Sequence, residues 1–172
     1  MIEYTGFIYC PRCSKASLET FQTNGIRCKA CNFIYFHNTA SAAGAFILST
    51  EGTLFIRRAQ PPKKGFLDVP GGFTNYGESL ESALKREIRE ELNVKITDCK
   101  YMCSFPNTYQ YQTVTYHTVD AFYICHYDEN QTLQPNEEIE EMVWVKDINS
   151  FQMDQLAFDS TKAALTLLKI YW

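Results

Sequence analysis

Long apolar runs and an excess of positive charge are both absent from this chain of 172 residues. No apolar run approaches the roughly 20 residues that a membrane-spanning helix needs, so we expect a soluble protein with no membrane partner. Lys and Arg number 16 against 20 Asp and Glu, and the net charge of −4 argues against a broad nucleic-acid-binding surface. With 45% hydrophobic residues, the chain can bury one sizeable core and a small appendage.

The N-terminus lacks the features of a secretory signal, because Met1-Ile-Glu-Tyr4 carries an acid and no apolar stretch. We therefore expect a cytoplasmic protein in a reducing compartment, where disulfides are rare. Histidine is also scarce, and its positions have no metal-ligand spacing, so these residues are expected to be structural or exposed. They are His37, His117 and His126.

Cysteine, in contrast, occurs in a clear pattern near the start of the chain. Two C-x-x-C pairs are separated by fourteen residues: Cys10 with Cys13, and Cys28 with Cys31. Four thiolates meet the tetrahedral requirement of structural Zn²⁺ and leave no open position for catalysis. Residues 1–36 therefore resemble a zinc ribbon, a domain too small for its own core that folds around its ion. The other cysteines lack such spacing and are expected to be small buried residues: Cys99, Cys103 and Cys125.

A glycine-rich turn precedes a predicted helix in the middle of the chain. The turn contains Gly71, Gly72 and Gly77. The helix is predicted over residues 79–92, with Ser79 as its N-cap. Asn93 follows it, and asparagine tolerates the left-handed backbone expected just past a helix end.

One face of this predicted helix changes from apolar to acidic. At about 100° per residue, Leu80, Ala83 and Leu84 form a stripe, and its continuation holds three carboxylates. These are Glu87, Glu90 and Glu91. Carboxylates crowded on a semi-buried face repel one another and are costly to desolvate, unless they protonate or bind a cation. Oxygen ligands at i, i+3 and i+4 suit Mg²⁺ or Mn²⁺. The alternative is an ordinary acidic surface helix.

The spacing of this segment resembles the signature box of the Nudix hydrolases. Gly72 is followed after five residues by Glu78, and after seven more by Arg86-Glu-Ile-Arg-Glu-Glu91. Asn93 takes the place of the last glycine of the box. The resemblance implies an α/β protein, a Nudix α/β/α sandwich with a mixed sheet, over residues 37–172. It also implies Mg²⁺-dependent cleavage of the diphosphate bond in a nucleoside diphosphate linked to another group.

The resemblance also implies roles for individual residues. Glu87, Glu90 and Glu91 would hold the metal, together with the carbonyl of Gly71. Arg86 would orient a glutamate by a charge-assisted hydrogen bond, with Glu78 as its structural partner. A further ligand or base is expected from the acidic loop at residues 136–141, and Glu138 is the candidate. A solvated acidic loop explains any one of these glutamates equally well.

Substrate identity is open at this point. A zinc ribbon before a Nudix domain is similar to the NADH pyrophosphatase branch, but that branch's Ser-Gln-Pro-Trp-type motif is replaced here by residues 103–109. ADP-ribose and other nucleoside diphosphate derivatives are therefore equal candidates. Four residues are predicted to contact phosphate or stack on a base, although a surface salt bridge or a place in the core would also explain them. They are Arg58, Phe66, Tyr109 and Tyr111.

Two other classes of function remain open, as does a homodimer. One is a non-catalytic Nudix-like module that senses a nucleotide, although a sensor does not need the complete set of glutamates. The other is a zinc-ribbon protein that binds nucleic acid, against which the acidic charge counts.

The remaining elements are read from apolar patterns. A hairpin is predicted over residues 42–49 and 53–58 with its turn at Glu51-Gly52, and a loop is predicted at Pro106-Asn107. Further strands are predicted at residues 25–27, 100–105, 114–126 and 142–145, and a last helix at 160–168.

Overall fold

The computed structural model describes residues 7–112 and 114–171, and the chain divides into two compact units. The boundary between the units lies between Thr39 and Ala40. Within the described residues, no helix is both long enough and apolar enough to cross a membrane.

The first unit is a three-stranded antiparallel sheet with β2 as its middle strand. The strands are β1 (Leu18–Phe21), β2 (Gly25–Cys28) and β3 (Ile34–Phe36), so the strand predicted at residues 25–27 is confirmed. Among the described residues of this unit, the buried hydrophobic side chains are Cys10, Ile26 and Cys28. So small a core cannot stabilise a domain by itself, and two of its three members are cysteines.

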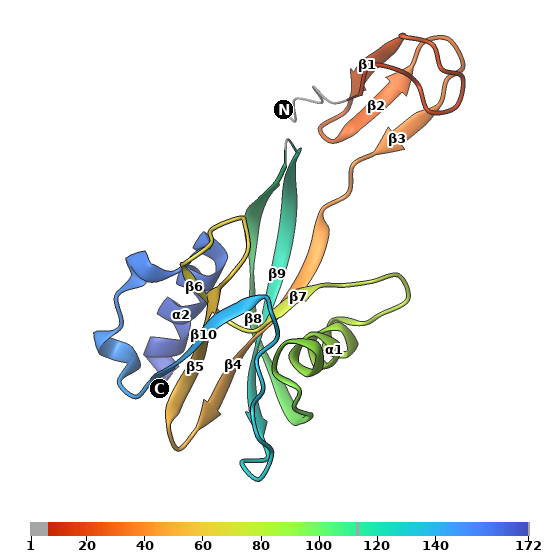
Figure 1. The fold of residues 1–172 in the computed structure, drawn as a ribbon. Coiled ribbons are helices and arrows are strands. Elements are labelled where there is room, and N and C mark those ends of the chain that lie inside the picture. The colour runs from red at the N-terminus through yellow and green to blue at the C-terminus, as the bar shows by residue number, and fades with distance from the viewer. Residues whose placement is uncertain (1–6, 113, 172) are drawn as a thin grey trace. The chain divides into compact units, whose positions relative to one another are not determined.

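The second unit is built on a seven-stranded mixed sheet, in which β4 and β9 are parallel and the other pairs antiparallel. Its main order is β10-β5-β4-β9-β8, while β6 pairs with β5 and β7 with β4. The strands are β4 (Ala40–Ser49), β5 (Gly52–Arg58), β6 (Leu67–Asp68), β7 (Gly71–Phe73), β8 (Ile96–Tyr111), β9 (Val114–Tyr127) and β10 (Ile139–Val145). The helices α1 (Leu80–Leu92) and α2 (Asp159–Tyr171) lie on opposite sides of the sheet (Figure 1). The predicted α/β/α sandwich is confirmed.

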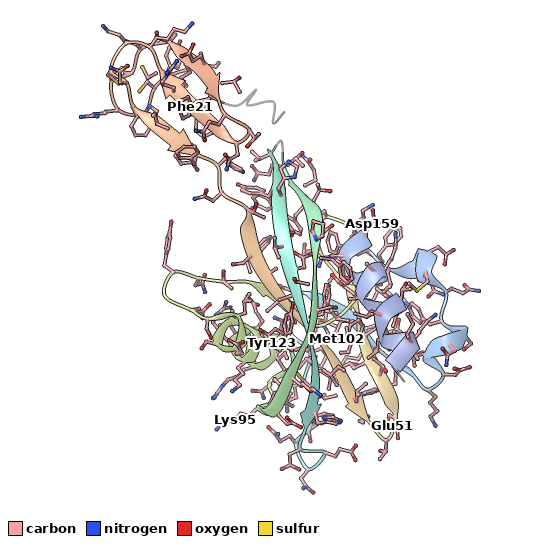
Figure 2. All side chains as sticks on the ribbon, turned by 180° about the vertical axis from the view of Figure 1, so that it is seen from behind. Phe21, Glu51, Lys95, Met102, Tyr123 and Asp159 are labelled. Atoms are coloured by element: carbon pink, nitrogen blue, oxygen red, sulfur yellow. The ribbon has the colours of Figure 1, made fainter. Side chains whose placement is uncertain are left out.

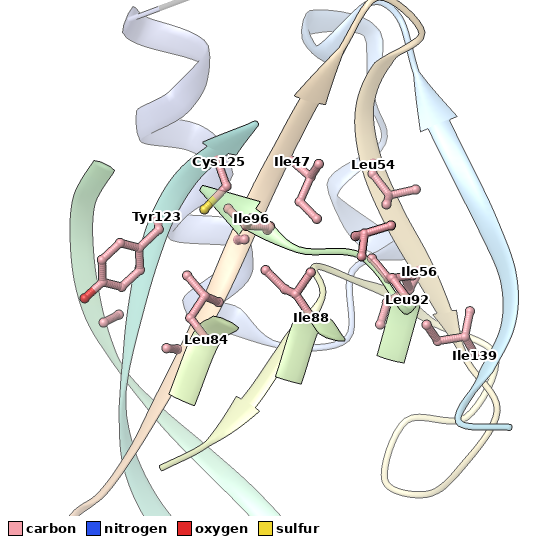
Figure 3. Close-up of a cluster of buried hydrophobic side chains, with 14 residues drawn as sticks. Ile47, Leu54, Ile56, Leu84, Ile88, Leu92, Ile96, Tyr123, Cys125 and Ile139 are labelled. Atoms are coloured by element: carbon pink, nitrogen blue, oxygen red, sulfur yellow. The ribbon is translucent and has the colours of Figure 1, made fainter. Parts of the chain in front are cut away.

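Alternation along the strands divides the core into two layers. Tyr123 of β9 packs in the layer beneath α1, whereas its neighbour Phe122 packs in the layer beneath α2. Figure 2 labels Tyr123 together with Met102 of β8, which packs against the α2 layer. Figure 3 shows the α1 layer, where Leu84 and Ile88 of the helix meet the inward side chains of the strands. This layer fixes α1 against the sheet and so fixes the position of its acidic residues.

The ends of α1 agree with the sequence prediction. Ser79 is the N-cap, and its hydroxyl accepts a hydrogen bond of 3.2 Å from the backbone N–H of Ser82. Asn93 ends the helix with φ of 57°, the left-handed conformation that its side chain tolerates. The predicted hairpin formed by β4 and β5 is also confirmed.

The loop predicted at Pro106-Asn107 is wrong. Both residues lie inside β8, where Pro106 is opposite Val119 and Asn107 is opposite Thr118 of β9. Because β8 is the last strand of the sheet order, a proline there can direct its missing N–H away from the only neighbouring strand. The continuous strand carries Asn107 and Tyr109 to the mouth of the pocket described next.

Candidate active site and candidate metal centre

Glu91 is the most deeply buried acid of α1. Glu91 is only 7% exposed, and its Oε2 accepts a hydrogen bond of 2.9 Å from the backbone N–H of Gly71. Burial raises the pKa of Glu91 to about 8, the Gly71 hydrogen bond opposes this shift, and the charge of Glu87 adds to it. Burial thus disfavours the charged form of Glu91, and a cation bound beside it would favour that form.

Glu87 lies one turn earlier and touches the same glycine turn. A Cβ built at Gly72 would lie 2.6 Å from the carboxyl carbon of Glu87, so a side chain there would displace the Glu87 carboxylate. Burial raises the pKa of Glu87, and the neighbouring Arg86 opposes that shift. The acidic face of α1 therefore packs directly on the Gly71-Gly72 segment.

Arg86 holds the acidic side chains in place. Its Nε donates to Glu78 Oε1 at 2.7 Å and its Nη2 to Glu78 Oε2 at 2.9 Å, a bidentate pair that lowers the pKa of Glu78 to about 2. Its Nη1 donates to Glu87 Oε1 at 2.7 Å and to Glu90 Oε2 at 3.1 Å. Glu78 is thus the structural partner of Arg86, and Arg86 in turn orients Glu87.

Glu90 and Glu138 stand further from this centre. The side chain of Glu90 is 57% exposed, so the expectation that all three helix acids lie on a semi-buried face is wrong for Glu90. Glu138 is exposed too, yet its charge raises the pKa of both Glu87 and Glu91, which places it near them. Among the described residues, no three of these carboxylates have ligand atoms all within 4.8 Å of one another.

A pocket opens beside the glycine turn and is lined by Gly71, Gly72 and side chains of β5, β8 and β9. Two predicted substrate contacts line it. The Arg58 guanidinium lies 5.2 Å from the ring centre of Phe158, and its Nε donates to the carbonyl of Pro62 at 2.9 Å. The ring centre of Tyr109 lies 5.7 Å from that of Phe158. A cation and aromatic faces are therefore available in the same pocket.

Two acids that line this pocket, Asp68 and Asp120, are not among the residues that the sequence predicts for the site. Burial raises the pKa of Asp68 to about 6, although Arg58 lies 3.6 Å away and Thr161 donates to Asp68 Oδ1 at 2.8 Å. Asp120 accepts hydrogen bonds from three side chains: Asn107, Thr118 and Ser160. An acid between Leu67 and Val69, inside an apolar stretch, is the signal that could have revealed Asp68.

Two other predicted contacts lie outside the pocket lining. Phe66 is 41% exposed and packs with the Lys63 ammonium, whose Nζ is 5.7 Å from the ring centre. Tyr111 is 53% exposed at the end of β8. The structure does not bring either residue into the lining of this pocket.

The first unit presents a separate cluster of metal-ligand atoms. The Sγ atoms of Cys10, Cys13, Cys28 and Cys31 all lie within 4.8 Å of one another. Cys10 and Cys31 are 3.7 Å apart, as are Cys13 and Cys28. Four sulfurs at about 2.3 Å from one tetrahedral Zn²⁺ are separated by about 3.8 Å, so the cluster fits this ion.

Comparison with known proteins agrees with this geometry. The NUDIX domain family model matches residues 38–162, so the chain belongs to the Nudix family. It is similar to NAD-capped RNA hydrolase NudC of Photorhabdus laumondii, with 25% identity over 141 residues that cover 82% of this chain and 52% of NudC. It is also similar to human mitochondrial NAD(P)H pyrophosphatase NUDT13, with 26% identity over 96 residues, 56% of this chain and 27% of that protein. The chain thus spans about half, or less, of the length of these relatives.

The fold itself matches solved Nudix structures. A NUDIX hydrolase from Nitrosomonas europaea superposes with a TM-score of 0.70 at 18% identity, covering 96% of this chain and 93% of that one. At this identity the match concerns the fold alone. The likeness to the NADH pyrophosphatase branch therefore comes from the sequence relatives and the four-cysteine cluster.

Proposed function

We propose that the chain is a Mg²⁺- or Mn²⁺-dependent pyrophosphohydrolase that cuts the diphosphate linkage of a nucleoside diphosphate derivative such as NADH or ADP-ribose. The observation that carries the proposal is the buried carboxyl group of Glu91, which accepts a hydrogen bond from the backbone N–H of Gly71. Gly71 in turn lines a pocket that also contains a guanidinium and aromatic rings. The names of both curated relatives contain NAD or NAD(P)H, which supports a dinucleotide substrate. We place the reaction in the cytoplasm.

The donor set fits a hard divalent cation. Carboxylates of Glu87, Glu90 and Glu91, with the carbonyl of Gly71, would supply the oxygen ligands that Mg²⁺ and Mn²⁺ prefer. When bound, the cation supplies charge neutralisation for the diphosphate and lowers the pKa of the attacking water. Glu91 would give up its proton on binding, since the raised pKa reflects burial rather than a partner that needs the acid form.

The chain's own side chains would divide the remaining work. Arg86 fixes the carboxylate of Glu87 through the 2.7 Å hydrogen bond. Glu138, which is exposed and near Glu87 and Glu91, is the candidate base for the attacking water. Arg58 would contact a phosphate oxygen. Tyr109 and Phe158 would pack against the base or the nicotinamide.

A hydrolysis screen tests the proposal. Zinc-loaded protein is incubated with NADH, NAD, ADP-ribose, diadenosine polyphosphates and nucleoside triphosphates, with Mg²⁺ or Mn²⁺, and the products are separated by chromatography. Cleavage at the diphosphate of NADH or ADP-ribose should yield AMP and the other phosphorylated half. The alternative of a nucleotide sensor predicts that a ligand raises the thermal midpoint and is recovered intact with both metals.

The four cysteines would bind one structural Zn²⁺, because their spacing fits its tetrahedral geometry and residues 7–39 bury almost no apolar side chains other than cysteine. Elemental analysis of protein purified without chelators should give one zinc per chain.

A further inference from the structure

Cys99 and Cys125 form a pair that the proposed function does not use. They lie directly opposite each other on the antiparallel strands β8 and β9, and their Sγ atoms are 2.9 Å apart. Directly opposed residues on such strands have Cα atoms about 4.5 to 5.5 Å apart, which falls within the range that a disulfide bridges. An S–S bond of about 2.05 Å therefore requires only a small movement of the side chains.

The two sulfurs differ in how easily solvent reaches them. Cys125 is fully buried in the layer beneath α1, where Figure 3 shows its sulfur near Ile96. Cys99 is only partly buried and belongs to the last strand of the sheet. A small reagent can thus reach Cys99 first, and the resulting intermediate already faces a second thiol.

The surroundings of Cys99 favour its reactive form. The hydrogen bond that Cys125 donates lowers the pKa of Cys99, and the charge of Lys85 on α1 lowers it further. The pKa of Cys125 is raised by this contact and by burial, so Cys125 keeps its proton. Cys99 is therefore the thiol suited to attack a peroxide, and Cys125 is the thiol that faces the modified sulfur.

Cys103 provides an internal comparison. It lies on the same strand as Cys99 but packs against the layer beneath α2, on the other face of the sheet. Burial raises its pKa to about 11. Cys103 should therefore react more slowly than Cys99 and lacks a sulfur opposite it, since its partner in register is Phe122.

We propose that Cys99 and Cys125 are an oxidative modification site, at which a peroxide forms a reversible disulfide across β8 and β9. The Cys99 thiolate attacks one peroxide oxygen, the O–O bond breaks, and one water leaves after protonation, which makes a sulfenic acid. The Cys125 sulfur then attacks the Cys99 sulfur, its proton passes to the departing hydroxyl as the S–O bond breaks, and a second water leaves. Two thiols are oxidised and one hydrogen peroxide is reduced to two waters.

The crosslink joins residues that are 26 positions apart and lies in the layer that supports α1. Because it restricts the unfolded chain and leaves the register of the native strands unchanged, it should raise the thermal midpoint by several degrees. A thiol reductant should return the midpoint to its starting value.

Peptide mapping tests the proposal on the zinc-loaded wild-type chain. Trypsin cuts after Lys95 and Lys100, which isolates Cys99 in the peptide 96–100, while Cys103 and Cys125 remain in the peptide 101–146. After one equivalent of hydrogen peroxide, we expect these two peptides to be joined, with the loss of two hydrogens, and to separate on reduction.

Matched variants identify the second sulfur. Cys103→Ser should keep the linked peptides and the rise in thermal midpoint, whereas Cys99→Ser, at the more exposed member of the pair, should lose both. The proposal is overturned if peptide 96–100 stays unlinked while thiols are consumed, if it joins a peptide from the first unit, or if Cys103→Ser abolishes the link.

Discussion

The cysteines of the first unit and the glutamates of α1 are two sets of candidate metal ligands, and the fold holds them in different ways. The four sulfurs already lie at the separations that one tetrahedral ion requires. The glutamates are spread between a buried acid, a half-buried one and an exposed one, and Arg86 bonds two of them. A closed, preformed cluster is typical of a structural metal, whereas an open set that gains ligands from substrate and water is typical of a catalytic one.

The largest expected effect is on the open site. Glu91→Gln preserves the shape of the side chain but removes the charge that would bind the cation. Hydrolysis should fall by about 10³-fold, equivalent to about 4 kcal/mol of transition-state stabilisation. Steady-state kinetics on the best substrate of the screen measures the change. Because glutamine cannot ionise, folding should be intact, and slightly improved at the higher pH where Glu91 begins to ionise. Near wild-type turnover would show that Glu91 does not bind the metal.

Substitutions in the four-cysteine cluster should change the zinc content and the folding of the first unit rather than remove catalytic groups. A Cys10→Ser/Cys13→Ser variant should lose its zinc, because two hydroxyl oxygens replace two of the four thiolates. The backbone amide hydrogens of the first unit should then exchange faster with solvent. Elemental analysis and hydrogen exchange measure these outcomes. Retention of wild-type zinc content would show that the four-cysteine assignment is wrong.

The buried acid of the open site also predicts a pH dependence of stability. The pKa of Glu91 is about 8 in the fold and 4.5 as an ordinary value, so the folded state holds a proton that the unfolded state releases between these limits. Asp68, with a pKa of about 6 against 3.8, acts in the same direction at lower pH. The contribution of these two groups to the free energy of unfolding is therefore fully present below pH 4 to 5, and it is lost as pH rises towards 8.

Urea denaturation from pH 5 to 8, without added Mg²⁺ or Mn²⁺, measures this slope. We expect a loss of roughly 2 to 4 kcal/mol in the wild type, and a smaller loss, confined to pH below about 6, in Glu91→Gln. Identical slopes in the two proteins would show that Glu91 does not hold the proton.

The smallest expected effect concerns the pocket. Arg58→Lys keeps the positive charge but loses the planar donors that could contact a phosphate, so kcat/KM should fall by about tenfold. The matched change Phe66→Leu, outside the pocket lining, should alter kcat/KM by less than about twofold. An equal loss of kcat/KM in both variants would contradict the conclusion that Arg58 lies in the substrate pocket and Phe66 lies outside it.

Local patterns predicted much of this molecule. The ends of α1 follow from Ser79 and Asn93, and the cysteine spacing indicates the cluster of the first unit, because these features depend on neighbours in the chain. The pocket could not be predicted in the same way. Asp68 and Asp120 meet Arg58 and Phe158 only through the pairing of β5 with β6 and of β4 with β9, and through the packing of α2.

The Pro106 error has the same origin. A proline in the sequence predicts an interruption of a strand, and the strand order is what shows that β8 lies at an edge, where a missing N–H is tolerated. Similarly, helical periodicity placed Glu90 beside Glu87 and Glu91, but the depth to which each acid is buried depends on how α1 packs against β7 and the sheet.

The central claim is that the acidic face of α1 binds a divalent cation. Titration of zinc-loaded protein with Mn²⁺, following the free ion by electron paramagnetic resonance, tests it without any substrate. The wild type should bind Mn²⁺, with affinity that rises with pH as Glu91 ionises, and should gain thermal stability on binding. A Glu87→Gln/Glu91→Gln variant should lose both effects. Equal Mn²⁺ binding by the wild type and this variant would contradict the claim.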